Sequence, residues 1–157
     1  MRRKDREITD RDEIVAILSR CHVLHLGLTD GNEPYIIPMN YGFLKEEESF
    51  TLYMHCAKEG RKLDIMAKNN RVCFEVECDA ELFASKDVGD WTMFYKSVIG
   101  YGCIYIVEDD AEKREGLNIL LAHHGYKEEV VFSESDFART NVLKIVVEDI
   151  MGKQNLK

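Results

Sequence analysis

Alternating hydrophobic and polar residues predict that most of this chain forms β-strands. Leu24, Leu26 and Leu28 fall at every second position, so they would share one buried face of a strand. The same alternation, or a continuous extended apolar run, recurs along the chain. Six strands are predicted on this basis, at residues 21–28, 33–43, 49–54, 72–78, 91–107 and 142–150.

Apolar residues at helical spacing predict two amphipathic helices, at 11–20 and 112–124. Asp10 and Glu13 form a capping-box pattern at the start of the first helix. In the second helix, His124 completes a stripe made by three leucines, which is typical of a packed or capping histidine. The glycine that follows is expected to end this helix.

Two prolines, Pro34 and Pro38, interrupt the predicted strand 33–43. Each lacks the backbone N–H that a central strand donates, so this strand belongs at an edge of the sheet or in a bulge. An interrupted edge exposes backbone groups that a planar heterocycle could bind, but the residues alone favour an ordinary edge strand. Asp30 and Gly31, just before it, predict a hairpin turn.

Segments 79–90 and 127–141 show no period and are predicted to be a loop and a flap. Gly100 and Gly102, inside the longest predicted strand, indicate bulges or close approaches. Strands outnumber helices and hairpin signals join them. The pattern therefore favours a mainly β fold with helices, an antiparallel β-barrel of the α+β type, over a doubly wound sheet.

The composition is that of an ordinary globular domain, with 157 residues, 45% hydrophobic and 32% charged. We expect a single domain, 1–157, with a flexible basic tail at 1–9. The net charge of −8 argues against nucleic acid as a partner. The sequence shows no signal peptide and no bilayer-spanning run, and its five cysteines lack disulfide-scaffold spacing. No membrane partner and a cytoplasmic location are therefore expected.

The stretch 55–62 joins a predicted strand to a predicted helix at 63–69 and concentrates positive charge. Lys58, Arg61 and Lys62 crowd one turn of an otherwise acidic chain, together with a glycine that lets a ligand approach the backbone. Free N–H groups and the positive dipole end of a helix attract phosphate, whereas cations alone oppose the dipole. On this stretch alone, a phosphate cradle and a plain helix start with solvated charges are about equally supported.

Three other candidate chemistries are weaker. His22 and His25 would point to opposite faces of a strand, and the chain has no C-x-x-C or H-E-x-x-H motif, so no metal site is predicted. Cys56 adjoins His55, but neighbours on a strand face opposite ways, which favours a small buried thiol over a nucleophile. The aromatic-rich segment 91–102 fits barrel core and a dimer surface better than a ring-stacking wall for a flat cofactor.

Taken together, these motifs resemble a known family. The pattern comprises Pro-Met-Asn-Tyr at 38–41, His-x-Ala-x-x-Gly-x-Lys at 55–62, Asn-x-Val-Cys-Phe-Glu-Val at 70–76 and Ile-x-Gly-Lys at 150–153. It resembles the pyridoxamine 5′-phosphate oxidase-like FMN-binding split barrels, specifically the nitroimidazole-resistance (Nim-type) branch, over almost the whole chain. The resemblance implies a six-stranded antiparallel split barrel with flanking helices, and a homodimer with FMN at the subunit interface.

The resemblance also assigns site residues. The FMN phosphate would be held by Ala57, Lys58, Gly60, Arg61 and Lys62. The isoalloxazine would be lined by Pro38, Met39, Asn40 and Tyr41, with His55 and Cys56 beside them. The neighbouring subunit would contribute Trp91, Tyr95, Ser97 and Val98. His55 is the catalytic candidate, because its charge is adjustable near neutral pH; a hydrogen bond to flavin or backbone is an equal alternative.

The function implied by the resemblance is an FMN-dependent oxidoreductase. It would pass electrons from a reduced nicotinamide or similar donor to a small acceptor such as a nitro-aromatic (5-nitroimidazole). Two other classes stay open: a flavin-binding protein without a substrate, and a haem-binding or haem-degrading split barrel. In the last case an axial ligand would come from His25, His55, His123 or His124. Pyridoxamine phosphate is not expected as a substrate, because a second basic cluster for its phosphate is lacking.

Overall fold

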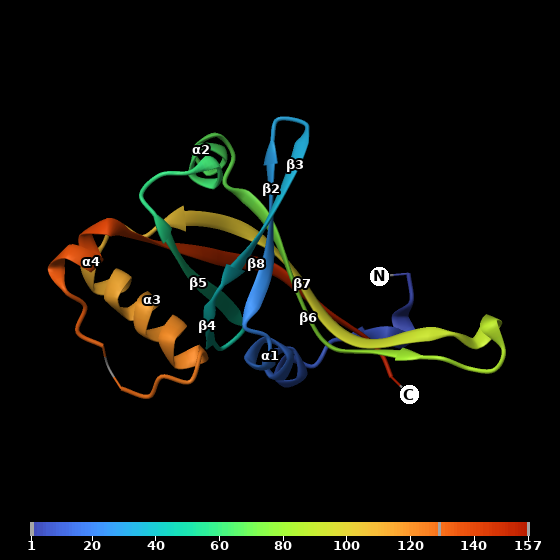
Figure 1. Cartoon of the computed structure of the whole chain (residues 1–157). Coiled ribbons are helices and arrows are strands. Elements are labelled where there is room, and N and C mark those ends of the chain that lie inside the picture. The colour runs from blue at the N-terminus through green and yellow to red at the C-terminus, as the bar shows by residue number, and fades with distance from the viewer. Residues whose placement is uncertain (1, 129, 157) are drawn as a thin grey trace.

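The computed structural model describes residues 2–128 and 130–156, which form mainly antiparallel strands (Figure 1). Residues 1, 129 and 157, which belong to the predicted domain, tail and flap, lie outside the described residues. The strands are β1 (Glu7–Ile8), β2 (Val23–Asp30), β3 (Glu33–Asn40), β4 (Gly42–Glu46), β5 (Ser49–Ala57), β6 (Arg71–Phe83), β7 (Thr92–Ile106) and β8 (Thr140–Asn155). The helices are α1 (Arg11–Arg20), α2 (Arg61–Lys68), α3 (Asp110–His123) and α4 (Glu134–Arg139), with short 3-10 turns η1 (Lys4–Arg6) and η2 (Val88–Asp90). None of the helices in the described ranges has the length and hydrophobicity that a bilayer span requires.

The strands form one antiparallel sheet in the order β3-β2-β6-β7-β8-β5-β4, and β1 pairs with β8 beside this path. β3 lies at an edge, as its two prolines predict. The predicted hairpin turn joins β2 to β3, where Gly31 has a φ of 63°. The predicted fold class, a mainly β split barrel with flanking helices, is confirmed.

The described chain contains eight strands rather than the predicted six. β1 is too short for a period to be visible, and the predicted strand 33–43 is two strands, β3 and β4, at opposite edges of the sheet. Only Tyr41 separates them, so the sheet curls until its two edges meet at this residue. Tyr41 is fully buried and its hydroxyl donates a hydrogen bond to the Leu18 carbonyl oxygen, 2.7 Å away. One buried tyrosine therefore anchors the junction that closes the split barrel.

Two hydrophobic clusters hold the fold together. In the main core, the alternating residues of the strands, such as Leu24, Leu26 and Phe74, are fully buried inside the barrel. Helix α1 adds three more buried residues, Ile14, Ile17 and Leu18. The second, smaller cluster lies beneath α3 and α4 and comprises Tyr53, Val107, Leu117, Phe137 and Val142.

Helix α1 has the predicted bounds, and Asp10 is its N-cap. The Asp10 carboxylate accepts a hydrogen bond from the Asp12 backbone N–H, 2.9 Å away. The predicted capping-box role of Glu13 is wrong, because its side chain forms an ion pair with another residue instead. Its carboxylate accepts a hydrogen bond of 2.8 Å from the Lys96 amine on β7.

Strands β6 and β7 run past the barrel as a long two-stranded arm (Figure 1). The loop predicted at 79–90 is therefore wrong in its first part, where β6 continues to Phe83. The pairing of β6 with β7 shifts register between Cys78 and Glu81. Such a shift moves alternate residues to opposite faces, which hides the strand period from the sequence.

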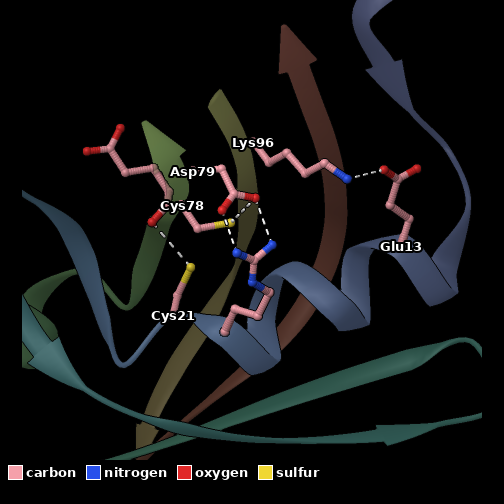
Figure 2. A network of polar contacts seen from close by, with 7 residues as sticks. Glu13, Cys21, Cys78, Asp79 and Lys96 are labelled. Atoms are coloured by element: carbon pink, nitrogen blue, oxygen red, sulfur yellow. Dashed lines mark hydrogen bonds and ion pairs between the residues drawn. The ribbon is translucent and has the colours of Figure 1, made fainter. Parts of the chain in front are cut away.

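Helix α1 braces the base of this arm (Figure 2). Arg20 and Asp79 form a two-pronged ion pair at the register shift, where Asp79 has a φ of 59°. Beside them the Cys21 thiol donates to the Glu77 carbonyl oxygen at 3.3 Å. With the Lys96 ion pair already described, both strands of the arm are tied to one helix.

The two glycines predicted to permit close approach do so. A Cβ on Gly100 would overlap the Phe74 ring, and one on Gly102 would overlap the Val146 carbonyl oxygen. Gly102 also follows a register shift between β7 and β8. Both positions therefore require the absence of a side chain.

The predicted flap, 127–141, contains a helix, α4, that its sequence does not reveal. Ser133 is the N-cap, and its hydroxyl accepts a hydrogen bond from the Asp136 N–H at 3.1 Å. Phe137 is the only residue of α4 that is buried, so no apolar period marks the helix.

The predicted basic tail is also partly ordered. Residues Glu7–Ile8 form β1 and pair with Gly152 and Lys153 of β8. Ile8 is buried in the main core. Contact with a distant strand, which local sequence does not encode, orders this segment.

Candidate functional site

The predicted cradle, 57–62, is the turn from the end of β5 to the start of α2. Gly60 is the N-cap of α2, and its φ of 144° is one that a residue with a side chain rarely adopts. A glycine N-cap offers no side chain to the helix N–H groups, and a Cβ there would meet no atom within 4 Å. The start of α2 is therefore open and uncapped, which is the geometry of a phosphate site.

Arg61 links this turn to the edge strand β3. Its guanidinium lies 3.6 Å from the Glu33 carboxylate and 4.8 Å from the centre of the Tyr35 ring. The ion pair is exposed on both sides and therefore weak, so an incoming anion can compete for the guanidinium.

Cys56 and His55 lie at the end of β5 beside the turn. Burial raises the pKa of the half-buried Cys56 thiol, and the nearby amines of Lys62 and Lys58 offset only part of this effect. The protonated thiol that results fits the prediction of a small packed side chain. His55, in contrast, is exposed and lies opposite Val142 of β8.

The predicted isoalloxazine residues on and after β3 divide into two pairs. Pro38 and Asn40 are exposed, whereas Met39 and Tyr41 are buried in the core. Side chains of the exposed pair are available to a ligand on the outer face of the edge strand. Those of the buried pair serve the core instead.

The four predicted residues on and before β7 lie along the arm and its base. Trp91 is half exposed and its indole N–H donates to the Ser85 carbonyl oxygen at 2.8 Å. The Tyr95 ring lies 5.7 Å from the Lys153 amine, and Val98 is fully buried. Ser97 lies between them, half-buried. The arm extends away from the part of the barrel that carries α2 (Figure 1). Tyr95 is on β7 of this arm, and Trp91 is the C-cap of η2 just before it.

A cluster of histidines that the sequence does not indicate lies where α3 meets β2. Ring centres of His22, His123 and His124 are 5.1–5.7 Å apart. His123, not His124, is the packed residue: its ring lies 4.8 Å from that of Tyr41, and its Nε2 lies 2.7 Å from the Cys21 carbonyl oxygen. Of the two predicted roles of His124, the packed one is wrong and the capping one is confirmed, because His124 is the exposed C-cap of α3.

Burial favours the neutral forms of two of these histidines. Burial, and then the neighbouring imidazoles, lower the pKa of both His123 and His124, although hydrogen bonding to backbone partly opposes the shift. Across the residues that the structure describes, no group of three or more His, Cys, Asp or Glu side chains is arranged to hold a metal ion.

A cavity of 170 Å³ lies between α3, α4 and the end of β5. The sequence misses it because two of its walls, Phe132 and α4, belong to the segment predicted as a flap. Its lining consists of His55, Leu117, Leu120, Leu121, Phe132, Asp136, Phe137 and Thr140.

The outer face of the sheet carries exposed apolar side chains. The pairing register places Ile36, Gly27, Cys73 and Tyr101 in one row across four strands. Ile36 is 68% exposed and Tyr101 41%. A groove of 410 Å³ at this row is lined by His25, Gly27, Ile36, Cys73, Phe74 and Glu75. A contiguous exposed apolar patch is typical of a site that binds another protein or a ligand.

Several solved structures share this fold. A candidate 5-nitroimidazole antibiotic resistance protein from Bacteroides thetaiotaomicron is 29% identical, with a TM-score of 0.82 over 94% of this chain and 86% of that one. The flavocytochrome Anf3 from Azotobacter vinelandii is 18% identical, with a TM-score of 0.80 over 100% and 72% of the two chains. An FAD and heme binding protein from Mycobacterium smegmatis is 17% identical, with a TM-score of 0.85 over 97% and 74%. The last two show likeness of fold alone.

The family profile identifies the parent family, and the Bacteroides structure agrees with its nitroimidazole-resistance branch. No curated protein matched the chain. The profile of the family described as "Pyridoxamine 5'-phosphate oxidase" matches residues 10–154, which span every strand of the barrel except β1 and the last residue of β8. This chain belongs to the pyridoxamine 5′-phosphate oxidase family.

Proposed function

We propose that the chain is an FMN-dependent oxidoreductase that transfers electrons from a reduced nicotinamide or similar donor to a small acceptor, such as a nitro-aromatic. The observation that carries the proposal is the open, uncapped start of α2 with Lys58, Arg61 and Lys62 around it, in a chain of net charge −8. A local concentration of cations at a free helix N-terminus is stabilised by a bound phosphate.

The chain's own residues would hold FMN at the junction of β5, α2 and β3. Backbone N–H groups after Gly60 and the side chains of Arg61 and Lys62 would bind the phosphate, while the exposed Pro38 and Asn40 would line the ring. FMN, when bound, supplies hydride and electron transfer. His55, exposed and two residues before Ala57, is the side chain that we assign to positioning the acceptor or donating a proton.

A second copy of the chain completes the site in this proposal. Trp91 and Tyr95 lie on the arm, which points away from the chain's own cradle, and a partner's arm would supply them in trans (Figure 1). The exposed row from Ile36 to Tyr101 offers an apolar surface for that partner. Location in the cytoplasm, which the sequence predicts, remains part of this proposal.

Names of the structural relatives agree with a flavin. One is a flavocytochrome, one an FAD and heme binding protein, and a third, also from Mycobacterium smegmatis, an FAD binding protein. Those descriptions concern proteins less than 25% identical to this chain. They support the binding of a flavin here. We propose FMN in particular because it carries one phosphate and the chain offers one phosphate cradle.

The test is the visible spectrum of the purified protein, with the chromophore identified after denaturation. Released FMN, together with oxidation of a reduced nicotinamide that depends on an added nitro-aromatic, is the expected result. FMN without turnover above that of free flavin would indicate a flavin-binding protein instead. A Soret band would favour haem, and a colourless protein that fails to take up FMN would refute the proposal.

A further inference from the structure

The cavity between α3, α4 and β5 is large enough for one aromatic ring. Its volume of 170 Å³ is close to that of engineered apolar cavities of about 150 Å³ that bind benzene. Leu117, Leu120 and Phe137 in its walls are buried, and Leu121 is half-buried. His55 and Asp136 in its lining are exposed, so the cavity opens to solvent on one side and a ligand can enter it.

Polar groups occupy one side of the cavity. Among the described residues the His55 imidazole forms no hydrogen bond, so both of its ring nitrogens are available. The Thr140 hydroxyl donates to the Asp136 carbonyl oxygen at 2.8 Å and keeps its acceptor capacity. Asp136 itself is engaged, because its carboxylate accepts from Ser133 and Arg139.

We propose that this cavity binds a monocyclic aromatic molecule with one polar substituent. The ring lies among the leucines and phenylalanines, and the substituent forms a hydrogen bond with His55 or Thr140. An apolar chamber with a few convergent polar groups is the usual form of a small-molecule site. The volume excludes a three-ring flavin, so the ligand is a different molecule from the proposed cofactor.

The cavity also borders the candidate cradle. His55 lines it, and Ala57, two residues later on β5, begins the cradle turn. Thr140, on the neighbouring strand β8, is the register partner of Ala57. Identification of the bound ring as the electron acceptor rests on the proposed function. Binding of the ring itself does not.

The test uses p-cresol and its isostere p-xylene, with the full-length protein as purified. Titration followed by ligand-observed NMR should give a Kd of about 1 mM for p-cresol, a usual affinity for a ligand of this size. If His55 or Thr140 bonds the hydroxyl, p-xylene should bind about tenfold more weakly. Equal or tighter binding of p-xylene would overturn the polar contact.

Two neighbouring positions on α3 give a matched pair of variants. Leu121→Trp fills the cavity and should abolish p-cresol binding, whereas Ala122→Trp, on a separate groove lined by Arg114 and Asn118, should leave it unchanged. The opposite pattern would overturn the site. If Leu121→Trp fails to fold, NOEs from p-cresol to Leu117 and Phe137 in the unsubstituted protein decide the question, and their absence refutes the proposal.

Flavin content separates this inference from the proposed function. Each sample is assayed for bound FMN alongside p-cresol binding. Binding of p-cresol by a protein that neither contains nor takes up FMN would support the cavity site and refute the cofactor proposal. Flavin without ring binding would do the reverse.

Discussion

Replacement of Arg61 and Lys62 by alanine tests whether the turn between β5 and α2 holds a phosphate. Both residues lie in the first turn of α2, whose N-cap Gly60 supplies no side-chain hydrogen bond. The double variant removes two cations from the place where a phosphate would lie, without a change to the core. Arg61 is exposed and Lys62 only half-buried.

The expected magnitude follows from the two charged hydrogen bonds to the phosphate that the double variant removes. A hydrogen bond to a charged group contributes about 1.5–3 kcal/mol, so two of them contribute about 3–6 kcal/mol. Their removal corresponds to a roughly 10²–10⁴-fold weaker Kd for FMN. Release of Arg61 from Glu33, an exposed pair at 3.6 Å, changes this by at most about 1 kcal/mol.

Quenching of flavin fluorescence measures both FMN and riboflavin, which lacks the phosphate. In the unsubstituted protein FMN should bind more tightly than riboflavin, and in the double variant the two affinities should converge because only FMN has a phosphate for Arg61 and Lys62 to bind. Lys68→Ala is the matched control: this cation lies at the other end of α2, 3.2 Å from Asp30. An FMN affinity that falls by less than about tenfold would refute the cradle.

Three further predictions concern stability and are read out by urea denaturation. Gly100→Ala places a Cβ against the Phe74 ring and should cost about 1–3 kcal/mol; an unchanged midpoint would contradict the close packing. Leu117→Ala enlarges the cavity under α3 and should cost about 2–5 kcal/mol; a cost below this range would mean that the walls collapse. The pKa values of His123 and His124 are lowered in the folded state, so the unfolded chain binds protons first as pH falls below about 6.5. Stability present above that pH should be lost as pH falls through the lowered values, and His123→Gln should reduce the drop.

Local sequence was enough to predict elements whose causes are local. The bounds of α1 follow from Asp10 as N-cap and a helical apolar stripe. The edge position of β3 follows from two prolines, which cannot donate to a neighbour. The turn after β5 follows from its glycine and cations. In each case a few adjacent residues carry the physical reason.

Elements that depend on distant partners escaped prediction. The break at Tyr41 is set by the meeting of two sheet edges, and the hydrophobic pattern continues across it without interruption. Helix α4 buries one side chain and therefore has no period. The histidine cluster needs β2 and α3 to meet, and it is His123, to which the helical stripe gave no role, that packs against Tyr41 there.

The strand order carries a consequence for how the chain folds. β8 is central: it pairs with β7, β5 and β1, and so joins the β3-β2-β6-β7 half of the sheet to the β5-β4 half. β8 begins only at Thr140, after all of the other described strands, so during synthesis the two halves remain unjoined until those strands have been made. β1 waits longest, because its partners are Gly152 and Lys153. A fold closed by its most distant contacts pays loop-closure entropy before those contacts form, and is expected to fold slowly, with both half-sheets exposing free edges meanwhile.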